Sequence, residues 1–316
     1  MHDRCSSRER RFAGFLQKLS LALPGAPLMS WSNTRSHPEE LTITASGANI
    51  FVRVWRPVMP PRAILVICHG VNSHGGQYFW AAERMAERGF IVYALDLRGR
   101  GRSSGPRFYV EHVDEYVADL AATVDLAKSR DEALPIYLLG HSAGGVVSTV
   151  YALEHQSELA GFICESFAFQ VPTPYFILTL VKGLSHYLPN APVLRLKNEE
   201  FSRDPEVVKR LNEDPLTGGE VQPALTVAAL VRANEHLKKN FHQIKLPLLI
   251  LHGTEDKTTK PSGSKFFDQR AGSSDKTLKL YEGHFHDLLA DFGKQQVIAD
   301  IQRWIETRLS HARKPR

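Results

Sequence analysis

The sequence contains only three cysteines in 316 residues, and their spacing is not that of a metal site or a redox motif. Cys68 and Cys164 lie inside apolar runs, and Cys5 lies near the amino terminus. This small, odd number excludes a fold built on disulfides. We therefore expect Cys68 and Cys164 to be buried as small apolar side chains, and we expect the protein to occupy a reducing, cytoplasmic compartment.

Long hydrophobic runs are also missing, since none reaches the roughly 18 residues that cross a membrane. Residues 12–23, FAGFLQKLSLAL, follow basic residues as the core of a secretion signal would. However, Gln17 and Lys18 interrupt the apolar centre, and no convincing cleavage site follows. We expect residues 1–38 to form an amphipathic or disordered leader, and secretion is the less favoured alternative.

The net charge of +5 is not arranged like a nucleic-acid-binding surface. Part of it comes from RERR at residues 8–11 and HARKPR at residues 311–316. No stripe of Lys and Arg interleaved with aromatic residues occurs, and there is no zinc-finger or helix-turn-helix pattern. We therefore expect no nucleic-acid partner and at most a weak attraction to anionic membranes. The oligomeric state does not follow from the sequence.

The sequence does contain a regular alternation of strand-like and helix-like stretches. Residues 41–46 and 49–57 alternate polar and apolar side chains, which predicts an antiparallel hairpin. Short, almost wholly apolar runs follow, typical of parallel strands buried on both faces. These runs are residues 63–70, 89–96, 136–142 and 160–166. Because stretches with helical periodicity separate them, the pattern predicts a doubly wound, mostly parallel α/β sheet.

The alternation stops near Phe167 and resumes with an apolar run at residues 246–253. The interruption is too long for a plain loop, so it should contain helices of its own. We therefore expect an α/β core formed by residues 39–166 and 242–316, with a helical lid or cap inserted at residues 167–241. Within the insertion, PYFILTLVKGLSHYL is more apolar than a surface helix needs. It could pack against the sheet or form a lid over a pocket for a lipid-like substrate.

A serine flanked by glycines follows the apolar run at residues 136–141. GHSAG at residues 140–144 has the G-x-S-x-G form, and a helix-compatible stretch comes next. In such a strand-to-helix turn the serine is exposed at the carboxyl edge of the sheet. We therefore predict that Ser142 is a nucleophile and that the amide of Ala143 stabilises an oxyanion.

A serine nucleophile needs a histidine base and a carboxylate, which in this architecture follow it in the order acid, then histidine. Asp256 follows the apolar run at residues 246–253, and neighbouring Glu255 and the earlier Glu165 are alternatives. After the run at residues 276–283, both His284 and His286 are candidates for the base. All these positions lie at strand ends on the side of the sheet where we expect Ser142.

A second oxyanion donor should follow an earlier strand, and the amide of Val71, after His69-Gly70, is the natural candidate. The nearby loop DLRGRGRSSG at residues 96–105 carries three arginines. We favour solvated loop packing for them over an anion-binding role.

Taken together, these motifs resemble the monoglyceride lipase and lysophospholipase-like branch of the α/β-hydrolase fold. The matching segments are HGVNSHGGQY, GFIVYALDLRGRGRSSG, GHSAGG, SRDPEVVKRLNEDPL, LLILHGTEDKTTKP and YEGHFHDLL, and they extend from about Leu41 to the last helix. The resemblance implies Ser142 as nucleophile, Asp256 as acid, His286 as base, and Val71 and Ala143 as oxyanion amides. Arg100 departs from the family, where histidine is frequent, and the lid diverges most.

We therefore predict a serine hydrolase, without cofactor or metal, that cleaves carboxylic esters such as monoacylglycerols, with transient membrane contact through the lid. One alternative is an esterase for small or aromatic acyl esters, or a lysophospholipase. Another is a non-catalytic receptor that binds a ligand on a hydrolase scaffold.

Overall fold

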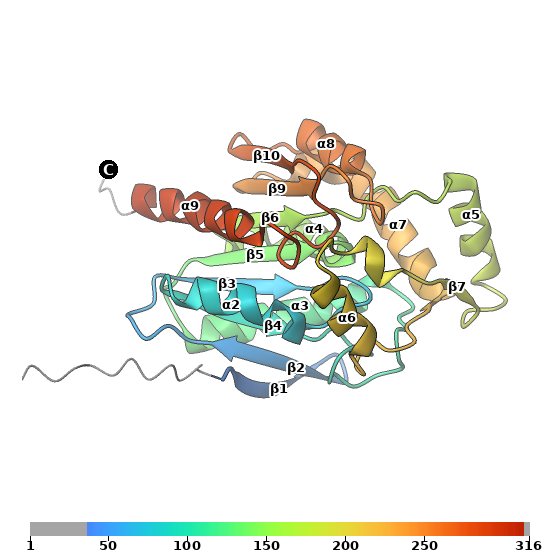
Figure 1. Ribbon diagram of the computed structural model, residues 1–316, viewed down its shortest axis with the longest axis horizontal. Coiled ribbons are helices and arrows are strands. Elements are labelled where there is room, and N and C mark those ends of the chain that lie inside the picture. The colour runs from blue at the N-terminus through green and yellow to red at the C-terminus, as the bar shows by residue number, and fades with distance from the viewer. Residues whose placement is uncertain (1–36, 313–316) are drawn as a thin grey trace, which may run out of the picture. The chain divides into compact units, whose positions relative to one another are not determined.

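Eight strands form one sheet in the computed structural model, which describes residues 37–312 (Figure 1). The predictions made for Cys5 and for the leader up to residue 36 lie outside the described residues. The strand order is β1-β2-β4-β3-β5-β6-β9-β10. The strands are β1 (Glu39–Ala45), β2 (Ala48–Trp55), β3 (Ala63–Cys68), β4 (Phe90–Leu95), β5 (Ile136–His141), β6 (Gly161–Glu165), β9 (Leu248–Gly253) and β10 (Lys276–Tyr281).

The direction of these strands confirms the sequence prediction. β1 and β2 form an antiparallel hairpin, and β2 runs antiparallel to β4. Every other neighbouring pair is parallel. All residues of β3, β4 and β5 are buried, as their continuous apolar runs predict for strands covered on both faces. The carboxyl ends of the six parallel strands therefore meet at one edge of the sheet.

Helices cover both faces of the sheet, and successive side chains of a strand enter different cores. Val66 and Cys68 belong to one apolar cluster, and Leu65 and Ile67 belong to the other. The first cluster includes side chains of α3 (Val113–Arg130), α4 (Ala143–His155), α7 (Ala224–Asn240) and α8 (Pro261–Arg270). The second includes side chains of α2 (Phe79–Ala86) and α9 (Lys294–Ala312), which lie on the near face in Figure 1. Cys68 and Cys164 are both fully buried, as expected.

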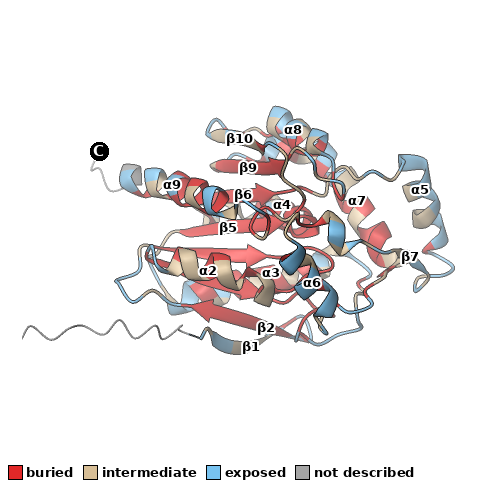
Figure 2. Ribbon diagram, in the orientation of Figure 1, coloured by how far each residue is buried: buried red, intermediate tan, exposed pale blue. Residues whose placement is uncertain are grey.

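Residues 167–241, called the intervening segment below, contain helices of their own, as their length predicted. They form α5 (Tyr175–Leu184), α6 (Pro205–Glu213) and α7, with the 3-10 turn η3 (Asn198–Glu200) and a short sheet of β7 (Pro192–Leu194) and β8 (Gln222–Pro223). α7 packs against α3 and α4, whereas α5 packs on α7. No residue of α5 is buried, and Figure 2 shows this helix as an exposed element at one end of the molecule.

Most of the large apolar side chains of α5 and the turn after it face solvent. Tyr175, Phe176, Ile177, Leu180 and Leu184 are exposed in the helix, and Tyr187 and Leu188 are exposed after it. Of the two alternatives for this stretch, packing against the sheet is therefore wrong. None of the helices between residues 37 and 312 is long and apolar enough to cross a membrane.

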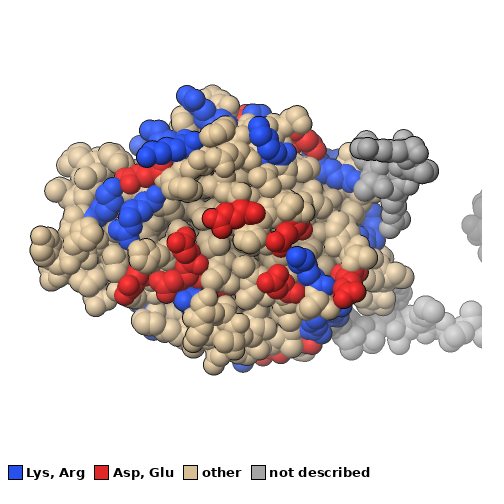
Figure 3. Space-filling model, turned by 180° about the vertical axis from the view of Figure 1, so that it is seen from behind, with Lys and Arg blue, Asp and Glu red and all other residues tan. Residues whose placement is uncertain are grey.

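The surface charge is mixed. On the face shown in Figure 3, Lys and Arg side chains lie among Asp and Glu side chains and do not form a separate stripe.

Candidate active site

Ser142 lies in the sharp turn between β5 and α4. Its backbone has a φ of 55° and a ψ of −121°, and the residue is 3% exposed. A positive φ is unusual for a residue with a side chain, and it persists only where the surroundings hold it. Here the Ser142 amide donates to the Glu165 carbonyl at 2.9 Å, and the Ala168 amide donates to the Ser142 carbonyl at 3.3 Å. The turn is therefore the strained elbow that the sequence predicts. The expectation that the serine is exposed is wrong, because the loop after β3 packs against Ser142 and leaves it buried.

Two glycines let the chain pack closely around this elbow. A Cβ on Gly70 would lie 2.8 Å from the Cβ of Ser142 and 3.2 Å from the amide nitrogen of Ala143. A Cβ on Gly144 would lie 2.2 Å from the carbonyl oxygen of Cys68. Because neither contact is tolerable, glycine is required at both positions. The loop after β3 consequently lies directly against the start of α4.

Asp256 and His286 are hydrogen-bonded, with 2.7 Å between Asp256 Oδ2 and His286 Nδ1. Both side chains are fully buried. The Asp256 carboxylate also accepts from the amides of Thr258 and Thr259, from the Thr259 hydroxyl, and from His252 Nε2 at 3.1 Å. Burial alone would raise the pKa of Asp256, but the charge of His286 and these hydrogen bonds hold that pKa well below its usual value. The acid is therefore ionised throughout the physiological pH range.

The backbone and ring of His286 are held beside the elbow. Ser166 Oγ donates to the His286 carbonyl oxygen at 2.6 Å, and Phe201 contacts the ring edge-on with centroids 5.1 Å apart. The ring of His141, the residue before Ser142, lies 4.9 Å from that of His286. The second ring nitrogen of His286, Nε2, is buried and has no hydrogen-bond partner among the described residues. It is therefore available to accept a proton.

His141 itself is a neutral structural histidine. Its Nδ1 lies 3.0 Å from the Tyr78 hydroxyl, and its Nε2 lies 3.4 Å from the carbonyl oxygen of His286. Burial, followed by the charge of His286, lowers the pKa of His141 to about 3. The neutral ring thus accepts from Tyr78 through Nδ1 and points its Nε2 hydrogen at the His286 backbone.

The amides of Val71 and Ala143 lie on the two loops that Gly70 brings into contact. Neither amide donates a hydrogen bond to another described residue. Val71 is 8% exposed and Ala143 is 6% exposed. Ala143 is the first residue of α4, where free amides and the helix dipole favour negative charge. This arrangement can stabilise an oxyanion next to Ser142.

The other candidate acids and the other candidate histidine do not form this hydrogen-bonded pair. His284 Nδ1 contacts the Glu282 carbonyl at 3.1 Å, away from Asp256. Glu255 contacts the backbone of His284 through its own amide and has no hydrogen bond to His286. Glu165 is fully buried at the end of β6, where burial, reinforced by the charge of Asp287, raises its pKa well above the usual value. Of the candidate pairs, the structure thus brings Asp256 and His286 together.

Several residues that hold this pair were not predicted from the sequence. Thr258 and Thr259 follow Asp256 by two and three residues, a spacing typical of turns in which an aspartate accepts from downstream amides. This spacing could have predicted both contacts from the sequence. Ser166 ends a predicted strand at the same edge of the sheet, but nothing in its sequence context indicates a contact with the backbone of His286.

The prediction of solvated packing for the arginines of residues 96–105 is wrong for two of the three. Arg98 is 7% exposed and pairs with Asp119, and Arg100 is 1% exposed and pairs with Glu220. Only Arg102 lies largely in solvent, where it pairs with Glu40. Carboxylates already neutralise these cations, so the loop is not an anion site either.

One group of described residues has donor atoms close enough to hold a metal ion. These atoms belong to His141, Glu165 and Asp287 and lie within 4.8 Å of one another. His141 already uses its ring nitrogens for Tyr78 and the His286 backbone. Burial also raises the pKa of Asp287, to about 6, although the charge of His286 opposes it. Because the raised carboxyl pKa values favour protons here, the group does not fit a metal well.

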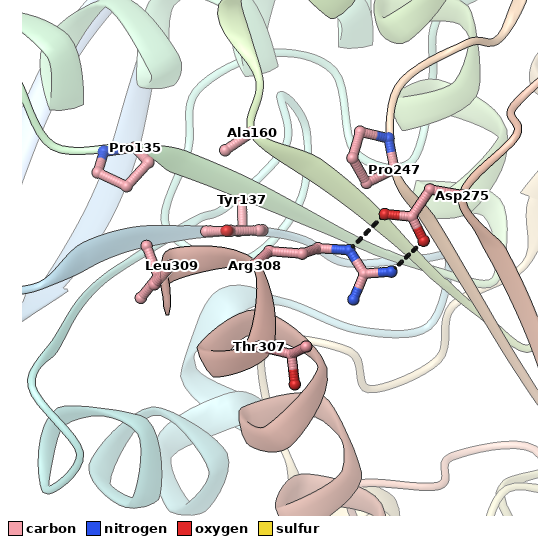
Figure 4. A pocket seen from close by; sticks show the side chains of 8 residues that line it. All are labelled: Pro135, Tyr137, Ala160, Pro247, Asp275, Thr307, Arg308 and Leu309. Atoms are coloured by element: carbon pink, nitrogen blue, oxygen red, sulfur yellow. Dashed lines mark hydrogen bonds and ion pairs between the residues drawn. The ribbon is translucent and has the colours of Figure 1, made fainter. Parts of the chain in front are cut away.

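A groove of about 510 Å³ lies at the opposite edge of the sheet. Figure 4 shows Tyr137 at the start of β5 and the ion pair between Arg308 and Asp275 across this groove. Ser142 lies five positions after Tyr137 along the extended strand, which is about 16 Å. The groove therefore does not belong to the site around Ser142.

Comparison with known proteins agrees with this architecture. Residues 59–292 match the family described as serine aminopeptidase, S33 (Hydrolase_4). The monoacylglycerol lipase of Mycolicibacterium smegmatis is 32% identical over 280 residues, which cover 88% of this chain and 99% of that protein. A monoglyceride lipase homolog of Monkeypox virus is 32% identical over 263 residues, which cover 82% of this chain and 95% of that protein.

A solved structure extends the comparison to three dimensions. The crystal structure of Paleococcus ferrophilus monoacylglycerol lipase superposes with a TM-score of 0.74 at 28% identity, covering 83% of this chain and 99% of that one. The chain therefore belongs to the serine aminopeptidase S33 family and has the α/β-hydrolase fold that its sequence predicts.

Proposed function

We propose that this protein is a serine hydrolase that cleaves carboxylic esters, with monoacylglycerols or similar single-chain lipid esters as its substrates. The observation that carries the proposal is the strained elbow at Ser142 beside a buried His286 whose Nε2 is unpartnered and whose Nδ1 is bonded to Asp256. The names of the lipases that are 32% identical to this chain support the substrate class.

In the proposed mechanism Ser142 Oγ attacks the ester carbonyl while His286 Nε2 takes its proton. Asp256, held ionised by its hydrogen bonds, keeps the Nδ1 hydrogen of His286 in place and stabilises the imidazolium that forms. The amides of Val71 and Ala143 receive the negative charge that develops on the carbonyl oxygen.

Collapse of the tetrahedral intermediate then releases the alcohol, which His286 protonates, and leaves the acyl group on Ser142. Water enters, His286 activates it, and the same oxyanion contacts assist release of the fatty acid. This sequence of steps uses only side chains and amides of the chain itself and calls for neither cofactor nor metal.

We assign the role of a cap over the substrate to the intervening segment, with core boundaries at residues 39–166 and 242–316. The apolar side chains of α5, among them Phe176 at 66% exposed and Leu180 at 67%, support contact with lipid. A contiguous exposed apolar surface of this kind favours a membrane or an aggregated substrate. In this proposal a cytoplasmic protein docks transiently on a lipid surface through α5 while it binds its substrate.

The experiment that tests the proposal measures fatty-acid release from monoacylglycerols of graded chain length beside short aryl esters, aromatic-acid esters and a lysophospholipid. Ser142→Ala is measured in parallel. We expect hydrolysis that depends on Ser142 and is fastest for medium- or long-chain monoacylglycerol.

Other outcomes would change the proposed substrate or contradict the proposed activity. Preference for short or aromatic esters would retain the mechanism and reject the lipid substrate, and preference for the lysophospholipid would move the substrate class to that lipid. Saturable ligand binding without turnover of any ester would contradict the enzymatic proposal and favour a receptor on a hydrolase scaffold.

A further inference from the structure

The peptide units on both sides of Val71 are held by buried hydrogen bonds. His69 Nε2 accepts from the Leu97 amide at 3.0 Å, so the ring hydrogen is on Nδ1, which donates to the Gly70 carbonyl oxygen at 2.7 Å. Since that carbonyl and the Val71 amide belong to one planar peptide unit, His69 sets the direction of the Val71 N–H. His69 belongs to the core and follows β3.

The unit on the other side is held from the intervening segment. The amide of Asn72 donates to Glu220 Oε1 at 2.7 Å. Asn72 is 7% exposed and has a φ of 58°, a conformation that its surroundings must maintain. Its side-chain Nδ2 donates to Asn198 Oδ1, also in the intervening segment. The loop that carries Val71 is thus fixed partly by residues about 125 to 150 positions away in sequence.

Glu220 is itself held by a buried cation. Its side chain and that of Arg100 are each 1% exposed, and the two form an ion pair through the same oxygen that accepts from Asn72. Arg100 in turn donates to the Tyr116 hydroxyl at 3.1 Å and to Gln222 Oε1 at 2.8 Å. A carboxylate accepting from both a guanidinium and an amide makes stronger, shorter hydrogen bonds than a neutral acceptor.

From these contacts we infer that Glu220 is a positioning residue for the oxyanion hole: it fixes the Val71–Asn72 peptide from the intervening segment, with Arg100 as its counter-ion. The inference rests on the proposed function, since it takes the Val71 amide as an oxyanion donor. It makes the intervening segment part of the catalytic geometry and not only a cover for the substrate.

A direct test separates the hydrogen bond to Asn72 from the stability of the ion pair. Removing Glu220 alone would leave the charge of Arg100 buried and unpaired, which can unfold the protein. We therefore compare Arg100→Met/Glu220→Gln, which keeps an oxygen acceptor for the Asn72 amide, with Arg100→Met/Glu220→Leu, which does not. Neither pair leaves a buried charge, and the two differ mainly in the acceptor.

Each variant is assayed with 4-nitrophenyl butyrate for kcat and KM, and with an alkyl trifluoromethyl ketone for inhibition. The ketone forms a tetrahedral adduct with the serine and places an oxyanion in the hole. Thermal midpoints are recorded for all variants. Thr226→Val is the matched control, because it breaks a buried contact between the intervening segment and the Val110 amide of the core, at 3.0 Å, away from Val71.

We expect kcat of the leucine variant to fall about 10- to 100-fold below that of the glutamine variant, with KM changed less than about twofold, since small displacements of catalytic groups have effects of this size. Ketone affinity should fall by the same factor, and Thr226→Val should change neither quantity. Equal kcat and ketone affinity in the two double variants, or a loss confined to KM, would overturn the inference. If Ser142→Ala also hydrolysed the ester, the proposed function would fail instead, so the two failures are distinguishable.

Discussion

The carboxyl edge of the sheet and helix α5 differ in how their side chains meet solvent. At the sheet edge Ser142, His286 and the side chain of Asp256 are buried, and Asp256 and His286 are hydrogen-bonded to each other and to their surroundings. In α5 no residue is buried, and most of its large apolar side chains face solvent. In the proposed function this difference has a physical reason: groups that break a bond must be held in place, whereas contact with lipid requires exposed apolar area. Substitutions at the carboxyl edge of the sheet should therefore lower turnover of every ester. Substitutions in α5 should change only binding to a lipid surface.

The largest expected effect comes from Asp256→Asn. The substitution keeps the shape of the side chain but removes the charge and favours the wrong imidazole tautomer, so kcat should fall about 10⁴-fold for soluble and lipid esters alike. Steady-state kinetics with both substrate types measures this. Asp131→Asn is the control, because Asp131 is ion-paired with Arg56 in another part of the molecule. A variant of Asp256 that kept more than about a tenth of kcat would contradict the assignment of the acid.

A smaller effect is expected for Gly70→Ala. The new Cβ would lie 2.8 Å from the Cβ of Ser142 and 3.0 Å from the carbonyl oxygen of His141, so the elbow or the Val71 loop must move. We expect kcat to fall about 10²-fold, again for all esters. Gly183→Ala in α5, where a Cβ would meet nothing within 4 Å, provides the control for the same kinetic measurement. Unchanged kcat in Gly70→Ala would show that the two loops are not as tightly fixed as their packing implies.

Phe176→Asp in α5 should weaken binding to lipid without changing hydrolysis of a soluble ester. Burial of a phenylalanine side chain is worth about 1.5–3 kcal/mol, so binding to vesicles should weaken about tenfold or more, while kcat/KM for a soluble ester stays unchanged. Liposome flotation measures the binding to vesicles, and steady-state kinetics with a soluble ester measures kcat/KM. Val58→Asp is the control, since Val58 is an even more exposed apolar residue. It belongs to the loop between β2 and β3, which lies away from α5 in Figure 1. Equal flotation of wild type and Phe176→Asp would contradict the proposal that α5 docks on a lipid surface.

The smallest expected effect is a change in the pH dependence of stability on replacing His141. Burial lowers the pKa of His141 to about 3 in the folded protein, below the value of about 6.5 expected when unfolded. Between these values the unfolded state binds more protons, so His141 makes the free energy of unfolding fall as pH falls, by up to about 1.4 kcal/mol per pH unit. In His141→Gln that dependence should be weaker between pH 6 and pH 4.5, as measured by urea unfolding. His186→Gln, at an exposed position, should behave like wild type, and an unchanged slope in His141→Gln would show that the ring titrates freely.

Much of this architecture could be predicted from the sequence because the signals are local. Continuous apolar runs indicate strands buried on both faces, and residues that follow parallel strands meet at one edge, which brings Ser142, Asp256 and His286 into one region. The choice of His286 over His284 came from the family resemblance and not from the residues alone. Periodicity could not decide between them, because both follow the same strand.

What could not be predicted depends on pairings between distant segments. Arg100 meets Glu220 across 120 positions, and no local pattern distinguishes a buried arginine from a solvated one when its partner is that far away. The exposure of α5 is a similar case, since an apolar helix looks the same in sequence whether it covers a sheet or faces solvent.

The most direct test of the central claim is covalent labelling with an alkyl fluorophosphonate, followed by intact mass measurement and peptide mapping. The reagent needs a serine activated by its histidine and an oxyanion hole, so it reports on the carboxyl edge of the sheet without depending on the substrate. We predict one adduct per chain, located on Ser142, with labelling greatly slowed in Asp256→Asn and unchanged in Phe176→Asp. An ester-hydrolysing protein that is labelled at another residue, or not at all, would contradict it.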